Sequence, residues 1–125
     1  MDFSLSADQL SMRESIRQLC ARFDANYWLE RDRSASFPDD FHRTIAEAGW
    51  LGIAMPQEYG GTGLGITEAA LMMQAISESG AGFSGASSVH MNIFGLNPIV
   101  VHGTTQQKKR WLPPIIRGEE RRVLP

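Results

Sequence analysis

The feature that most constrains the fold of this chain is a glycine-rich stretch, Trp50–Gly65, with the sequence WLGIAMPQEYGGTGLG. It begins with a short apolar run, is interrupted by Pro56, and carries four glycines in its last six residues. Glycine tolerates positive φ angles and lets another backbone or a ligand approach closely. Three explanations are open: a loop that cradles phosphate, a hinge, or a corner between two helical hairpins.

The spacing of these glycines argues against a nucleotide loop. Gly61 and Gly63 would need a third glycine at position 66 to complete a G-x-G-x-x-G motif, and Ile66 stands there. Residues 56–59 also separate the apolar run from the glycines, whereas a dinucleotide-binding turn follows its strand directly. No Gly-Lys-Ser/Thr sequence of a Walker loop occurs. We therefore favour a structural corner and keep a dinucleotide-binding half-domain as the least favoured alternative.

Apolar residues recur at spacings of three and four along most of the remaining sequence, which is the pattern of amphipathic helices. Capping boxes of the form S/T-x-x-Q, at Ser6–Gln9 and Thr104–Gln107, mark two helix starts. Pro113 and Pro114 are expected to end or bend the last helix, and residues 30–36 to form a loop. The predicted helices span residues 7–27, 38–48, 67–79, 83–94 and 104–111.

Together these patterns predict an all-α fold, a compact bundle of five or six helices with the glycine-rich stretch as its corner. The only candidate strand is Trp50–Met55, which has no second strand to pair with. A length of 125 residues suits one domain.

Composition excludes several classes of protein. The 12 basic and 14 acidic residues give a net charge of −2, without the basic excess of a nucleic-acid-binding module. A single cysteine cannot form an intramolecular disulfide and fits a reducing compartment. Neither a secretory signal nor a run of about 18 apolar residues occurs. These observations predict a soluble, cytoplasmic protein that neither binds nucleic acid nor spans a membrane.

The residues with reactive side chains do not combine into a catalytic site. The histidines, His42, His90 and His102, lie far apart without metal-binding spacing, and Cys20 falls on an expected helix face as a small core residue. For His90 a hydrogen-bonded, half-buried state is favoured over a ligand contact. No serine stands in a nucleophile elbow, and no two carboxylates form an acid/base couple. The chain therefore lacks a complete active site of its own.

Two stretches resemble segments of the acyl-CoA dehydrogenase family. Residues 56–63, PQEYGGTG, are similar to its PEEYGG-x-G segment. Residues 103–113, GTTQQKKRWLP, are similar to its G-T-x-x-Q-K-x-x-x-L-P segment. The order and separation of the two segments also match, as do residues 37–38 and 49–52. The resemblance covers essentially the whole chain and departs at residues 105–106, where the family often has acids.

The resemblance implies a flavoenzyme of three parts: an α-helical N-terminal domain, a middle β domain and a C-terminal helical bundle. In that family a carboxylate removes the α-proton of an acyl-CoA thioester while a hydride passes from the β-carbon to FAD. The flavin is held mainly by the middle and C-terminal domains, and the base usually lies in the last one. Residues 1–118 would correspond to the N-terminal domain, and residues 119–125 to the start of a missing middle domain or to an altered chain end.

In the family, the N-terminal domain supplies a wall of the acyl-chain pocket. By this resemblance the wall would map onto one helix and the residues Ala86, Ser87, His90, Met91 and Phe94. All of them except Met91 share one helical face by the i, i+3 and i+4 spacing. The small side chain of Ala86 would leave depth, and His90 would place a polar group far along the tunnel.

We therefore expect the N-terminal domain of an FAD-dependent acyl-CoA dehydrogenase, inactive alone and binding no cofactor by itself. Its partners would be an acyl-CoA substrate, an electron acceptor flavoprotein and further copies of the chain in a homo-oligomer. The alternative is a self-sufficient helical homodimeric interaction module without catalysis, which would bury its exposed apolar face against a second copy.

Overall fold

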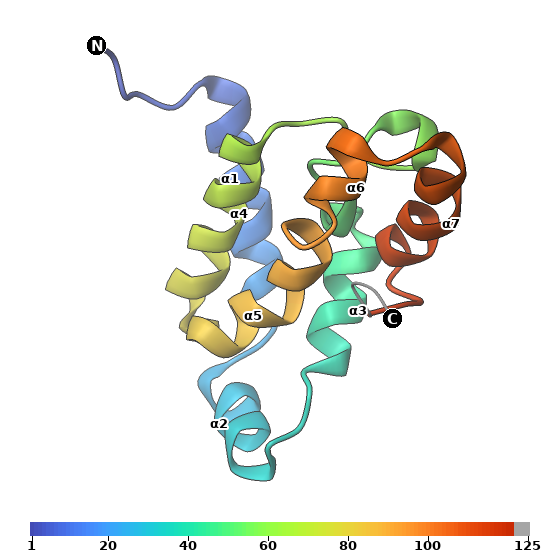
Figure 1. Ribbon diagram of the computed structural model, residues 1–125. Coiled ribbons are helices and arrows are strands. Elements are labelled where there is room, and N and C mark those ends of the chain that lie inside the picture. Colours follow the sequence, from blue (N-terminus) through green and yellow to red (C-terminus); the bar gives the residue numbers. More distant parts are fainter. Residues whose placement is uncertain (122–125) are drawn as a thin grey trace.

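Figure 1 shows the computed structural model, which describes residues 1–121 as a bundle of helices without a strand in that range. The all-α prediction is therefore confirmed. In chain order the elements are α1 (Ala7–Cys20), α2 (Ala25–Ser34), α3 (Asp39–Glu47), η1 (Trp50–Gly52), η2 (Gln57–Tyr59), α4 (Ile66–Ile76), η3 (Ser77–Ala81), α5 (Gly82–Ile93), α6 (Asn97–His102) and α7 (Thr105–Ile116). The end of the predicted tail, residues 122–125, lies outside the described residues. Within the described part, no helix has the length and apolar character needed to cross a membrane.

The predicted helix over residues 7–27 is two helices in the structure. α1 ends at Cys20, and α2 starts after Asp24, whose carboxylate accepts a hydrogen bond from the Tyr27 amide at 2.9 Å. An aspartate at this position pairs an amide that the first turn would otherwise leave unpaired. The prediction of one helix was wrong because the apolar spacing continues through Phe23, which lies in the turn between the two helices.

The predicted loop over residues 30–36 is wrong for most of its length, because α2 continues through Ser34. Only Trp28 is buried on α2, so no apolar stripe marks this helix in the sequence. The Trp28 ring meets the edge of Phe41 on α3 with the two centroids 4.9 Å apart. One large aromatic side chain therefore anchors a helix whose other side chains lie mostly in water.

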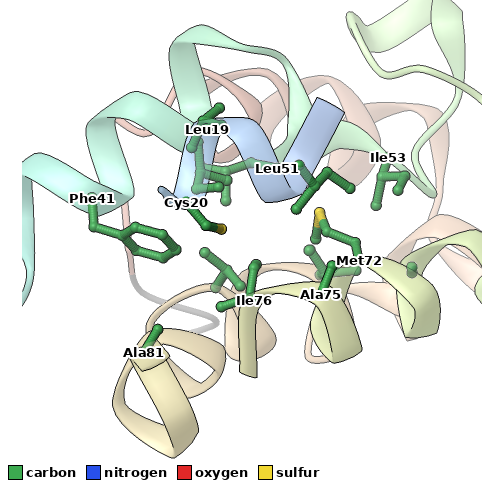
Figure 2. Close-up of a cluster of buried hydrophobic side chains, with 14 of the residues drawn as sticks. Leu19, Cys20, Phe41, Leu51, Ile53, Met72, Ala75, Ile76 and Ala81 are labelled. Carbon is green, nitrogen blue, oxygen red and sulfur yellow. The ribbon is translucent and has the colours of Figure 1, made fainter. Parts of the chain in front are cut away.

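The main hydrophobic core lies between α1, α3, α4 and α5, with α1 and α4 side by side (Figure 1). Figure 2 shows side chains of this core converging from α1, α3, α4 and η1. Phe41, Leu51, Met72 and Ile76 are each 0% exposed. Burial of a large apolar side chain contributes about 1.5–3 kcal/mol to stability. This cluster therefore holds the helices α1 to α5 together.

A smaller core cluster joins α6 and α7 to the glycine-rich stretch, with members Met55, Leu96, Leu112, Ile115 and Ile116. Pro113 and Pro114 do not end α7, which continues to Ile116. Each proline removes one helical hydrogen bond. Burial of the three apolar side chains of α7 beside the prolines offsets that loss, and the local sequence does not reveal this compensation.

The glycine-rich stretch is a corner closed on itself, as the sequence predicts. Three backbone hydrogen bonds of 2.8–2.9 Å join residues 62–64 to residues 52–55. Gly61 permits this closure, because a Cβ at that position would lie 2.1 Å from the carbonyl oxygen of Met55. The candidate strand over residues 50–55 is a 3₁₀ helix followed by a turn and a bend, so that prediction of a possible strand was wrong.

A wide turn of the π type, η3, connects α4 to α5 and directs α5 back beside α4 (Figure 1). Gly80 and Gly82 have φ angles of +98° and +55° in and after this turn. Glycine reaches such angles without the steric cost that a side chain would add. The turn therefore fixes which face of α5 meets the core.

Candidate functional site

The inner face of α5 fixes the position of the helix that carries the predicted site residues. Gly85, Val89 and Ile93 are buried at spacings of four. Gly85 lets the helix approach closely, since a Cβ there would lie 2.4 Å from the Ala81 Cβ and 3.2 Å from the Trp28 ring. The opposite side of α5 therefore faces outward.

Three of the five predicted wall residues line one small hollow on this outer side. Ala86, Ser87 and His90, together with Met73 of α4 and Phe83, surround a space of about 160 Å³. No Asp, Glu, Lys or Arg side chain lines it. Such a hollow suits an apolar group, with Ser87 and His90 as the polar contacts.

The other two predicted residues do not line the hollow. The Phe94 ring stacks on the His90 imidazole, with centroids 5.1 Å apart and planes inclined by 24°. Phe94 is half-buried against the main core, so it supports the orientation of His90. Met91 is 51% exposed, on a different side of α5 from the other four, as its sequence spacing indicates.

Met73 and Phe83 line the hollow without having been predicted. Phe83 is 86% exposed, which is uncommon for a phenylalanine. A signal for this face is present in the sequence, because residues 79–107 contain no Asp, Glu, Lys or Arg. In a chain with 21% charged residues so long an uncharged segment is unusual, and it carries the exposed side chains of Phe83, Met91 and Val101.

A buried polar pair lies on the inner side of α5. His42 of α3 and Asn92 of α5 are each 2% exposed and are joined by a hydrogen bond of 2.8 Å. Since the amide nitrogen of Asn92 only donates, the imidazole Nε2 accepts and the ring is neutral. Burial lowers the pKa of His42, the charge of Arg121 adds to this effect, and the charge of Asp39 opposes it. The pair fixes α5 against α3.

The described residues form no cluster of metal ligands, and the glycine-rich stretch has no free amides for a phosphate group. Within residues 1–121, no three His, Cys, Asp or Glu side chains gather as metal ligands would. The backbone amides of residues 60–65 all donate inside the chain, to carbonyls of residues 52–57 and to the carboxylate of Glu68. A loop that cradles phosphate needs such amides unpaired. Cys20 is buried, and burial raises the pKa of its thiol.

Comparison with known proteins places these features in a family. Residues 6–119 match the family model described as acyl-CoA dehydrogenase, N-terminal domain. The mitochondrial isovaleryl-CoA dehydrogenase of Pongo abelii is 33% identical over 117 residues, which are 92% of this chain and 27% of that protein. Acyl-CoA dehydrogenase FadE12 of Mycobacterium tuberculosis is 31% identical over 93% of this chain and 29% of that protein. The 3-(aryl)acrylate reductase of Clostridium sporogenes is 36% identical over 73% and 24%.

A solved structure is also similar to this chain. A chain from a structure described as the electron transferring flavoprotein of Acidaminococcus fermentans superposes with a TM-score of 0.82 at 30% identity, covering 95% of this chain and 31% of that one. The chain therefore spans less than a third of the length of the relatives it matches. It matches the acyl-CoA dehydrogenases through their N-terminal region.

Proposed function

Because this chain belongs to the acyl-CoA dehydrogenase family, we propose that residues 1–118 are the N-terminal α domain of an FAD-dependent oxidoreductase. The reaction would be dehydrogenation of acyl-CoA thioesters between the α- and β-carbons. In this proposal α5 supplies a wall of the acyl-chain pocket, and residues 119–125 lead toward a middle β domain.

The outward face of α5 is the observation that carries this proposal. Ala86, Ser87 and His90 line a hollow without formal charge, and Phe83 is 86% exposed beside it. Apolar surface of this kind is unfavourable in water and favourable against an acyl chain. The hollow also offers polar contacts from Ser87 and His90, which favours an acyl group other than a plain straight chain. The names of two relatives, isovaleryl-CoA dehydrogenase and 3-(aryl)acrylate reductase, agree with such groups.

FAD and the catalytic base would come from other parts of the complete enzyme. The backbone amides of the glycine-rich stretch donate hydrogen bonds within the chain, and no carboxylate lines the α5 hollow. The 125-residue chain alone would then bind no FAD and catalyse nothing. A separate flavoprotein would accept the electrons. We also propose that the complete enzyme is a cytoplasmic homo-oligomer.

Flavin reduction tests this division of roles. FAD and isovaleryl-CoA added to the 125-residue chain should leave the flavin absorbance unbleached. A chimera in which residues 1–118 replace the N-terminal domain of an isovaleryl-CoA dehydrogenase should bind FAD and reduce it with an acyl-CoA. Turnover by the chain alone would refute the proposal, and so would a folded, FAD-loaded chimera that does not respond to any acyl-CoA.

The wall itself is tested by filling the hollow. Ala86→Leu in that chimera should raise KM for isovaleryl-CoA by about tenfold, because one misplaced group in an apolar pocket typically changes discrimination by this amount. Butyryl-CoA, which is smaller, should be affected less. Ala70→Leu is the matched control, because Ala70 is exposed on α4. If Ala86→Leu left the order of preference among acyl-CoA substrates unchanged, the proposal that α5 supplies a wall of the acyl-chain pocket would be contradicted.

A second candidate, a helical homodimer without catalysis, is favoured by one observation. Phe83, Met91 and Val101 are 86%, 51% and 57% exposed, and a second copy could cover them. Sedimentation equilibrium distinguishes the candidates. A dimer that Phe83→Asp dissociates would favour the interaction module, whereas a monomeric chain that works in the chimera would favour the enzyme domain.

A further inference from the structure

A second, larger hollow lies between α2 and α5. It has a volume of about 530 Å³ and is bounded by the end of α2, by residues 35–38 before α3, and by the first turns of α5. It shares Phe83 and Ser87 with the smaller hollow but opens toward α2. One arginine, one aspartate, four serines and four apolar residues line it. Such a mixture suits a small ligand with a polar end and an apolar body.

Arg31 is the cation of this hollow, and the ion pairs found in residues 1–121 do not include it. Its guanidinium lies over the Tyr27 ring, 5.5 Å from the centroid, and its Nε is buried without an acceptor. The indole N–H of Trp28, one turn earlier on α2, is likewise buried without an acceptor. A cation in the last turn of a helix complements the terminal carbonyls. That role does not supply the missing acceptor, and a buried donor without one is unfavourable.

Serine hydroxyls from α5 border the same hollow. Ser84, Ser87 and Ser88 lie at i, i+3 and i+4 and therefore on one side of the helix. The Ser88 hydroxyl donates to the Gly85 carbonyl at 2.7 Å. Within residues 1–121 the hydroxyls of Ser84 and Ser87 have no such partner, so both can donate to a ligand.

Two further charged groups affect what the hollow can bind. Asp32 borders it beside Arg31, but its carboxylate is exposed, and water and salt screen exposed charges. Arg121 lies over the Phe37 ring, 4.3 Å from the centroid, and is paired with Asp39. The half-buried Arg31 is therefore the charge that a ligand in the hollow would meet most strongly.

From these contacts we propose that the hollow between α2 and α5 binds a small organic anion. Its carboxylate or phosphate group lies against Arg31, and its apolar body lies against Phe37 and Phe83. A guanidinium can donate two parallel N–H bonds to such a group, and Ser84 and Ser87 donate to the same oxygens. The site goes beyond the proposed acyl-chain wall and would remain if that wall were disproved.

Nuclear magnetic resonance of the isotope-labelled chain tests the site with four probes: benzoate, phenyl phosphate, inorganic phosphate and the neutral benzamide. Benzoate, phenyl phosphate or both should shift the Arg31 Nε–H and the Ser84 and Ser87 amides saturably. Benzamide should bind at least about tenfold more weakly, because it lacks the charge-assisted hydrogen bonds. The tighter of the two aromatic anions identifies a carboxylate or a phosphate ester as the ligand class. If inorganic phosphate bound as tightly as benzoate and phenyl phosphate, the proposal that the ligand is an organic anion would be overturned.

Neighbouring substitutions should act in opposite directions. Arg31→Gln should weaken binding of the better probe by about tenfold, and Asp32→Asn should strengthen it by roughly twofold because a screened repulsion is removed. Arg33→Gln removes an exposed cation of the same turn and should change nothing. If the amide spectrum shows that Arg31→Gln does not fold, the affinities of Asp32→Asn and Arg33→Gln for the same probe still test the site. Absence of saturable shifts, equal binding of benzamide, or weaker binding in Asp32→Asn would overturn the site.

Discussion

Residues 79–107 and the rest of the chain differ in the formal charge that they carry. All 12 basic and 14 acidic residues lie outside residues 79–107. Outside this segment, ion pairs such as Arg17 with Glu78 stand on the surface, and a capping box closes the start of α1. Inside it, Phe83 and Val101 remain exposed. The difference teaches that formal charges make the surface of one region favourable in water, while the other region carries no formal charge and is the one on which we have proposed a ligand surface.

The largest contrast is expected between two phenylalanines, one from each region. Phe41→Ala should lower the free energy of unfolding by about 3–5 kcal/mol, because Phe41 is 0% exposed and meets Trp28 and Phe23 at centroid distances of 4.9 and 5.3 Å. Phe83→Ala should change it by less than about 0.5 kcal/mol. Urea unfolding followed by circular dichroism measures both. Similar losses in the two variants would mean that the uncharged region is part of the folding core.

A second contrast concerns two adjacent glycines of the corner. Gly61→Ala should cost about 3 kcal/mol, because its Cβ would lie 2.1 Å from the Met55 carbonyl oxygen, a backbone atom. Gly60→Ala should cost about 1–2 kcal/mol, because Gly60 has a φ angle of +96° but no neighbour within 4 Å. Denaturant titration of the two variants is the measurement. A reversed order would show that φ strain, and not close approach, requires the glycines.

The buried pair behind the uncharged surface should make stability depend on pH. Burial lowers the pKa of His42 below its ordinary value of 6.5, so the unfolded chain binds a proton in a range where the folded chain does not. The free energy of unfolding therefore does not depend on His42 well above pH 6.5. It falls as the pH drops below 6.5, with a slope of at most about 1.4 kcal/mol per pH unit.

The measurement is the free energy of unfolding between about pH 5 and pH 8. His42→Gln should flatten the profile over that range. His90→Gln is the control, since its imidazole is exposed on the outer side of α5. An identical slope in His42→Gln would assign the pH dependence to other groups.

The smallest effect is expected from an ion pair of the charged region. Arg17 and Glu78 are 3.0 Å apart with side chains 43% and 44% exposed, and the hydrogen bond from Arg17 is the main cause that lowers the pKa of Glu78. Because solvent screens such pairs, Arg17→Gln should cost less than about 1 kcal/mol. Unfolding in low and in molar salt checks this. A larger loss that persists in molar salt would mean that surface charge also holds the helices together.

Much of the fold could be predicted because the signals are local. The capping boxes at Ser6 and Thr104 form as their spacing indicates, with hydrogen bonds of 3.1 and 3.2 Å to the amides of Gln9 and Gln107. The failures have physical reasons as well. α2 has a single buried side chain, Trp28, and therefore no periodic pattern to recognise.

The candidate site could be predicted only in part. Helical spacing places Ala86, Ser87 and His90 on one side of α5, and the structure brings the three to one hollow. The spacing says nothing of Met73, which reaches the hollow from α4, or of Phe83, whose exposure depends on what surrounds it.

The sequence by itself determined the helical class, the two capped helix starts, the corner and the family resemblance, because these depend on contacts within a few residues or on short motifs. Only the tertiary structure decided that α7 continues past Pro113 and Pro114, since that depends on burial against the corner. It also decided the pairing of His42 with Asn92 across 50 residues and the shape of both hollows. Such contacts join segments whose approach is set by packing of the whole core, and no short stretch of sequence contains that information.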